Sequence, residues 1–194
     1  MIQYFRIENG KIIDGPMPLP ESFSIYSNLA LRSAAELLLI GFYPLVDIQP
    51  THDTATQFCT LTGYTLGSSS VATDYAVSDL PLSTVKSNQI GAIKIAFDSA
   101  SIQPVTDANG TSWSGGQSSG NVIFLACQLA QQAGSANVTL WDSSNNSHTM
   151  TIAEGMTIAA TIGATFQSLY QKWQTLRAEI NASTTVASVL AITW

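Results

Sequence analysis

The chain has 194 residues, of which 45% are hydrophobic and only 10% are charged, and its formal net charge is −6 at pH 7. A chain with this balance can bury a sizeable core, which excludes global disorder, and its length allows one domain or two small ones. Its seven basic residues are spread along the sequence and form no cluster, so we expect no nucleic-acid binding.

The beginning of the chain is predicted to form a β-hairpin. Residues 2–7 and 11–14 are rich in β-branched and aromatic side chains, and Asn9 and Gly10 lie between them. Asn-Gly between two such runs is the strongest short signal for a hairpin. Prolines within residues 16–20 then predict an extended segment, in which the prolines lack the backbone N–H groups that donate hydrogen bonds to a neighbouring strand.

A short helix and three more strands are predicted to follow. Ser33 and Glu36 have the spacing of a capping box, which opens a helix that continues to about Ile40 and ends at Gly41. The further strands are expected at residues 42–48, 57–66 and 71–77.

Helical spacing replaces β-type alternation after Asp79, so we place a domain boundary there. The elements expected next are a helix at 81–101, a polar hairpin at 102–113, a helix within 116–134 and a hairpin at 137–152. Pro81 is expected at the first position of its helix. The predicted class is α+β: a small β-rich domain at 1–79, then a mainly helical domain at 80–194 with short β-hairpins.

A long helix is predicted after the capping box of Thr151 and Glu154. About 28 residues would give roughly 40 Å of helix, which is more than a small domain usually spans. The alternative is two helices that are split near Gly163. A last short helix at 185–190 would follow a Ser183 or Thr184 cap.

Apolar residues recur along one side of this long helix, and part of the stripe should contact a partner. Large aromatic side chains are frequent anchors of protein–protein contacts. The candidate interface residues are Phe166, Tyr170, Trp173 and Ile180.

One stretch matches a catalytic motif. Residues 116–120 fit G-x-S-x-G, the nucleophile elbow, with Ser118 as the nucleophile. The elbow needs a buried strand before it, whereas a polar turn precedes Ser118, so we interpret the segment as a helix entry with serine as cap. His52 and His148 lie in turn-like contexts without a credible nucleophile. We therefore predict no catalytic residues and no enzyme; a small serine hydrolase is the third-ranked hypothesis.

No cofactor or metal site is predicted. Cys59 and Cys127 form no C-x-x-C pair, so we expect two buried free thiols rather than zinc ligands. A disulfide between the two cysteines is the alternative. Phosphate-loop, dinucleotide and calcium-loop patterns are also missing. Trp113 and Trp141 flank hairpin turns, where they could stack on sugars but are expected to cover a small core.

The start of the chain lacks the basic and apolar regions of a signal peptide, and no run reaches about 18 apolar residues. We therefore expect a protein made in a cytoplasm without membrane insertion.

Two regions resemble a phage family. The first contains YFRIENGKIIDGP at residues 4–16 and GFYPLV at 41–46, and it continues through residues 64–66 and 75–82. It is similar to the N-terminal segment of short proteins encoded in phage tail-fibre gene clusters. From about Val85 the chain resembles a phage-associated domain of unknown function found in or beside tail-fibre proteins. The matching pieces are residues 92–94, Trp113, residues 141–142, MTIAE at 150–154, Phe166 and residues 177–182.

The resemblance implies a non-enzymatic virion protein of the tail fibre or baseplate, made in the bacterial host cytoplasm. Its partners would be tail-fibre or baseplate proteins, in an oligomer or a larger assembly. The alternative is a fibre assembly chaperone that is absent from the mature particle. Serine and threonine together number 43, and such an uncharged polar surface favours permanent burial in an assembly; a Ser/Thr-rich source is the other explanation.

Overall fold

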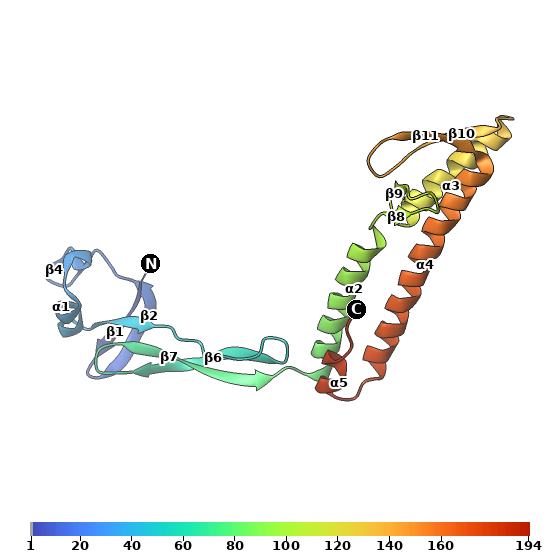
Figure 1. Cartoon of the computed structure of the whole chain (residues 1–194). Helices are drawn as coiled ribbons and strands as arrows, with labels where there is room; N and C mark the ends of the chain where they lie inside the picture. The colour runs from blue at the N-terminus through green and yellow to red at the C-terminus, as the bar shows by residue number, and fades with distance from the viewer. Residues whose placement is uncertain (1) are drawn as a thin grey trace. The chain divides into compact units, whose positions relative to one another are not determined.

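A computed structural model describes residues 2–194 (Figure 1). The predicted α+β class is confirmed, because the N-terminal part is a β-rich sheet and the C-terminal part is mainly helical with short hairpins. The chain forms two compact units, Met1–Leu80 and Pro81–Trp194.

A five-stranded sheet forms the N-terminal unit. Its strands are β1 (Gln3–Glu8), β2 (Lys11–Pro18), β5 (Phe42–Val46), β6 (Gln57–Leu66) and β7 (Val71–Asp79). Their order in the sheet is β2-β1-β5-β7-β6. Neighbouring strands are antiparallel, except that β5 runs parallel to β7.

The first hairpin forms as predicted, with Asn9 and Gly10 both at positive φ (50° and 71°) between β1 and β2. Strand β2 is longer than predicted, because it continues past Asp14 and pairs Met17 with Tyr4. Prolines are tolerated there because β2 is an edge strand, whose outer side needs no donors.

The segment between β2 and β5 covers one side of the sheet. The capping box of helix α1 (Ala34–Leu39) is confirmed: Ser33 N–H donates to Glu36 Oε2 at 2.8 Å, and Glu36 N–H donates to Ser33 Oγ at 3.3 Å. Buried Leu29, Leu37 and Phe42 form a small core there. The sequence did not predict three short elements: β3 (Ser22–Phe23), β4 (Tyr26–Ser27) and the 3₁₀ helix η1 (Leu29–Leu31).

Four helices and two hairpins form the C-terminal unit. The helices are α2 (Leu82–Ser101), α3 (Gln117–Gln132), α4 (Ile152–Ala182) and α5 (Val186–Leu190). The hairpins are β8 (Val105–Thr106) with β9 (Ser112–Trp113), and β10 (Asn137–Trp141) with β11 (Ser147–Thr151).

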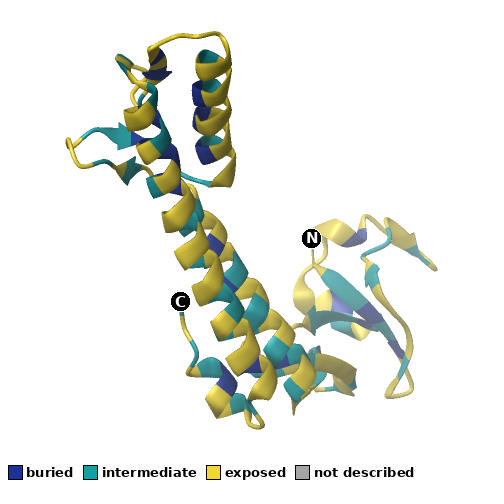
Figure 2. Cartoon of the chain, turned by 90° about the vertical axis from the view of Figure 1, so that its right-hand side faces the viewer, coloured by how far each residue is buried: buried dark blue, intermediate teal, exposed yellow. Residues whose placement is uncertain are grey.

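Helix α4 is the scaffold of this unit. It is one continuous helix of 31 residues, about 46 Å long, so the alternative of a split near Gly163 is wrong. Figure 1 shows α2 and α3 following one another along α4. Phe97 of α2 stacks on Trp173 of α4, and Gly120 of α3 lies against Ile162 of α4. Figure 2 shows that buried positions gather on the sides of the helices that face one another.

Two helix starts differ from the prediction. Pro81 is the residue before helix α2 rather than its first residue. Helix α5 is capped by Thr185 and not by Ser183 or Thr184, because Thr185 Oγ1 accepts the N–H of Ser188 at 3.1 Å.

The two hairpin tryptophans differ. Trp113 is 1% exposed and belongs to the core between α3, α4 and the hairpins, as predicted. Trp141 is 58% exposed, so the prediction that it covers a core is wrong. The reason is strand alternation, because Val138 and Leu140 of β10 point inward and the next residue points outward.

Candidate protein-interaction surface

The aromatic residues of the C-terminal half of α4 gather around Phe97 of α2. Trp173 stacks on Phe97 with ring centroids 5.5 Å apart, and Phe166 meets the same ring edge-on at 5.8 Å. Tyr170 and Trp194 complete the aromatic cluster at 6.2 and 6.1 Å. The cluster joins α2, α4 and the end of the chain.

The structure places the four candidate interface residues mostly inside this unit. Ile180 is fully buried, so it is a core residue and offers no contact surface. Phe166 and Trp173 are half-buried, and Tyr170 is the most open at 38% exposure. The physical reason is that α2 lies over this half of α4, where Lys86 Nζ donates to the carbonyl oxygen of Asn181 at 2.7 Å.

An uncovered apolar surface of the C-terminal unit lies instead on α3. Gly120, Ile123 and Cys127 face α4 and are buried. On the opposite side of the helix, Val122, Leu125 and Leu129 are 63%, 53% and 65% exposed. A helix that is hydrophobic all round is normally buried on all sides. No element of the C-terminal unit covers this side, which we call the outer side of α3.

The outer side of α3 also lacks charge. Helix α3 contains no charged residue, and none occurs anywhere between Asp107 and Asp142. The sequence predicted a helix within residues 116–134, as observed. The sequence also carries a second signal, because apolar residues lie on two opposite sides of this uncharged helix, and one partner helix cannot cover both.

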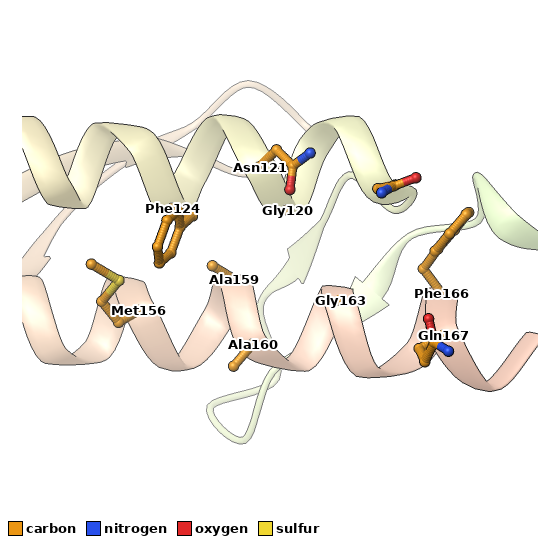
Figure 3. Close-up of a pocket in the computed structure, with 10 residues that line it drawn as sticks. Gly120, Asn121, Phe124, Met156, Ala159, Ala160, Gly163, Phe166 and Gln167 are labelled. Atoms are coloured by element: carbon orange, nitrogen blue, oxygen red, sulfur yellow. The ribbon is translucent and has the colours of Figure 1, made fainter. Parts of the chain in front are cut away.

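An apolar groove runs along one flank of α3, between this helix and α4. Its volume is about 600 Å³, and Phe124 and Met156 point into it from the two helices (Figure 3). Gly163 leaves it open, since a Cβ at this position would meet nothing within 4 Å. None of the residues that line the groove is charged.

A second hollow of about 250 Å³ lies on the other flank of α3. Ser118, Val122 and exposed Trp141 are among the residues that line it. The outer side of α3 is thus continuous with an exposed indole ring, which is a common anchor in protein contacts.

The G-x-S-x-G segment has no catalytic geometry. Ser118 is exposed in the first turn of α3, and within residues 2–194 it forms no hydrogen bond with a histidine. It is not the helix cap either, which corrects that expectation: Gly116, at φ 90°, occupies the N-cap position.

Both histidines have structural partners. His148 Nε2 lies 3.0 Å from Asp142 Oδ2 at the β10–β11 turn, and His52 Nδ1 lies 3.0 Å from the carbonyl oxygen of Pro50. The hydrogen bond from His148, together with N–H groups of Asn146 and Ser144, holds the pKa of Asp142 well below its usual range. This arrangement fixes a turn.

Both cysteines are free thiols. Cys127 is fully buried, and burial raises the pKa of its thiol. Cys59 is half-buried in β6, so the expectation of two buried thiols holds only for Cys127.

Over residues 2–194, no three His, Cys, Asp or Glu side chains are grouped so that they could hold a metal ion. None of the helices in this same range is long and apolar enough to span a membrane.

Comparison with protein families gives one match. The model described as Domain of unknown function (DUF4376) matches residues 84–193, which is more than half of the chain. No match was found among curated proteins or among solved structures.

Proposed function

The chain belongs to the DUF4376 family, and from that premise we propose that it is a non-enzymatic structural protein of the tail fibre or baseplate region of a phage virion. In this proposal it joins or decorates the fibre through protein–protein contacts. The phage assignment rests on the resemblance of residues 4–46 and of the region after Val85 to proteins of tail-fibre gene clusters. The mode of action rests on the surface of the C-terminal unit.

The observation that carries the proposal is the uncovered outer side of α3. Val122, Leu125 and Leu129 are each more than half exposed on successive turns. Burying a large aliphatic side chain contributes about 1.5–3 kcal/mol, so covering three that are half exposed would contribute several kcal/mol to an association. While these three side chains are exposed to water, they do not stabilise the fold of the isolated chain.

The composition of the chain supports the same proposal. Lysine and glutamate are depleted at protein interfaces, and only 10% of this chain is charged. A surface of serine, threonine and aliphatic side chains loses less hydration free energy when a partner covers it than a surface of lysine and glutamate does.

The test is mass spectrometry of purified phage particles from the host that makes this protein. We expect the chain at a fixed ratio to the other tail proteins after gradient purification. Absence from particles, with the chain present in the infected-cell lysate, would contradict the proposal and support the assembly-chaperone alternative.

The non-enzymatic part of the proposal has its own test. Because Ser118 has no histidine partner within residues 2–194 and is preceded only by the two-residue strand β9, Ser118→Ala should leave particle yield and infectivity unchanged. An esterase activity of the purified chain that disappears in this variant would contradict the proposal.

A further inference from the structure

We infer that the outer side of α3 is an interface between two copies of this chain, in which α3 of one copy crosses α3 of the other antiparallel near Leu125. This inference rests on the proposed function in one respect, that the chain acts through protein–protein contacts. It goes further by naming a second copy as the partner of this surface.

The order of residue types on the outer side, polar, aliphatic, aliphatic, aliphatic and polar, is the same in both directions. Side chains recur at alternating intervals of four and three residues, in the order Ser118, Val122, Leu125, Leu129 and Gln132. Leu125 is the centre, with an aliphatic residue and then a polar residue on either side. A two-fold contact needs such a self-complementary surface, since each copy presents the same patch to the other.

A two-fold axis near Leu125 would bring aliphatic side chains of one copy against aliphatic side chains of the other, and polar side chains against polar ones. The two Leu125 side chains would lie close together, and Val122 of each copy would pack near Leu129 of the other. The polar ends, Ser118 and Gln132, would then meet at the rim, where solvent reaches an interface.

The charge distribution permits a second copy on this surface and argues against a partner selected by charge. The chain carries a net charge of −6, so two copies repel each other wherever acidic residues meet. Helix α3 has no charged residue, so this repulsion is weakest at its outer side. A partner selected by charge complementarity would require charged groups on this surface, and it has none.

The available area suits a modest two-fold interface. Helix α3 has 16 residues and is about 24 Å long, and half of its circumference with exposed Trp141 gives roughly 500 Å² per copy, or about 1,000 Å² in total. That is the lower limit for a specific interface, so the dimer should dissociate on dilution. The hollow beside Trp141 gives Leu129 of the other copy a place to insert.

Sedimentation equilibrium of the full chain over a wide concentration range tests the inference. We expect the mass to rise from 20.6 kDa toward twice that value as concentration increases. Leu125→Glu and Leu125→Lys should each raise the dissociation constant at least about tenfold, because like charges would meet near the axis. An equimolar mixture of the two variants should recover the dimer, because opposite charges then meet.

Ile95→Glu is the matched control, since Ile95 is 69% exposed on α2 and lies outside α3. It should leave the dissociation constant within about twofold of the wild-type value. Circular dichroism should show that all variants are folded, because the substituted side chains are exposed.

Three outcomes would overturn the inference. The first is a wild-type chain that stays monomeric at the highest concentration, and the second is equal weakening by Leu125→Glu and Ile95→Glu. The third is a variant mixture that stays monomeric. A monomeric chain that is nevertheless found in particles would leave the proposed function standing, with a different protein on the outer side of α3.

Discussion

Gly155 of α4 lies directly against the thiol of Cys127 in α3: a Cβ added at Gly155 would be 2.6 Å from Cys127 Sγ. The same Cβ would be 3.1 Å from Val138 Cγ1 of strand β10. The missing side chain therefore lets α3, α4 and the hairpin share one core.

Gly155→Ala should destabilise the chain. The clash with the buried thiol costs about 1–3 kcal/mol, which outweighs the gain of up to about 1 kcal/mol from helix propensity. Urea unfolding followed by circular dichroism measures the difference. Gly163→Ala is the matched control in the same helix, where the Cβ meets nothing, and it should be neutral or stabilising by up to about 1 kcal/mol. Equal effects of the two changes would contradict the packing described.

Trp173 contributes to the aromatic cluster through its ring and not through its N–H group. Its Nε1 is buried and has no hydrogen-bond partner within the described residues. Trp173→Phe keeps a ring against Phe97 and removes the unsatisfied donor, so the free energy of unfolding should stay within about 1 kcal/mol of the wild-type value. Trp173→Ala removes the ring and should lower it by about 3 kcal/mol. A large loss with phenylalanine would show that the N–H group has a partner.

The two thiols should react at different rates. Cys127 is fully buried with a raised pKa, whereas Cys59 is half-buried in strand β6. The thiolate is the reactive form, so an aromatic disulfide reagent at pH 8 should modify Cys59 first and leave Cys127 protected until the chain unfolds. Cys59→Ser should abolish the early phase. No reactive thiol in the denatured, unreduced chain would indicate a disulfide.

Acidification should loosen the β8–β9 hairpin. The Nε1–H group of Trp113 donates to Asp107 Oδ2 at 2.8 Å, and this bond, with the N–H groups of Thr111 and Asn109, lowers the pKa of Asp107. A carboxyl group whose pKa is lowered by folding stabilises the folded state above its unfolded pKa, near 3.9, and loses that effect as the pH falls through its folded value.

The free energy of unfolding of Asp107→Asn should therefore be below that of the wild type at pH 7, and the difference should shrink as the pH falls below about 4. Chemical unfolding at several pH values measures it. Asp98→Asn, at an exposed carboxylate on α2, should change stability little at any of these pH values. A constant difference between Asp107→Asn and the wild type would show that the carboxylate charge is not involved.

Local signals predicted much of the fold. Thr151 and Glu154 form the capping box that begins α4, with Thr151 N–H donating to Glu154 Oε2 at 2.8 Å. The turn at Asn9 and Gly10 and the capping box of Ser33 were also predicted from the sequence. In each case the residues that determine the structure lie within four positions of each other, so the sequence alone contains the whole interaction.

Long-range packing could not be predicted in the same way. The parallel pairing of β5 with β7 joins residues that are far apart in the sequence, such as Leu45 and Val71. The spacing of the α4 stripe shows one apolar side but not what covers it. In the structure α2 covers it, and the end of the chain returns to α2, where Gln89 Nε2 donates to the carbonyl oxygen of Ile192 at 2.6 Å.

The sequence placed the candidate interface on α4, whereas the structure places it on α3, and the reason is again long-range packing. Both helices carry more apolar residues than one packing partner can cover. Only the three-dimensional arrangement shows that α4 packs against two helices along its length, whereas α3 packs against one helix.

We expect another protein chain to cover the outer side of α3 in the assembled particle. Alkylation of a cysteine introduced by Leu129→Cys into the Cys59→Ser chain tests this expectation, because position 129 is 65% exposed in the chain alone. In a dilute solution of the isolated chain the new thiol should react quickly, with buried Cys127 as the protected internal reference. In purified phage particles that contain the variant, the new thiol should be protected from alkylation. Equally fast alkylation in particles and in the isolated chain would contradict it.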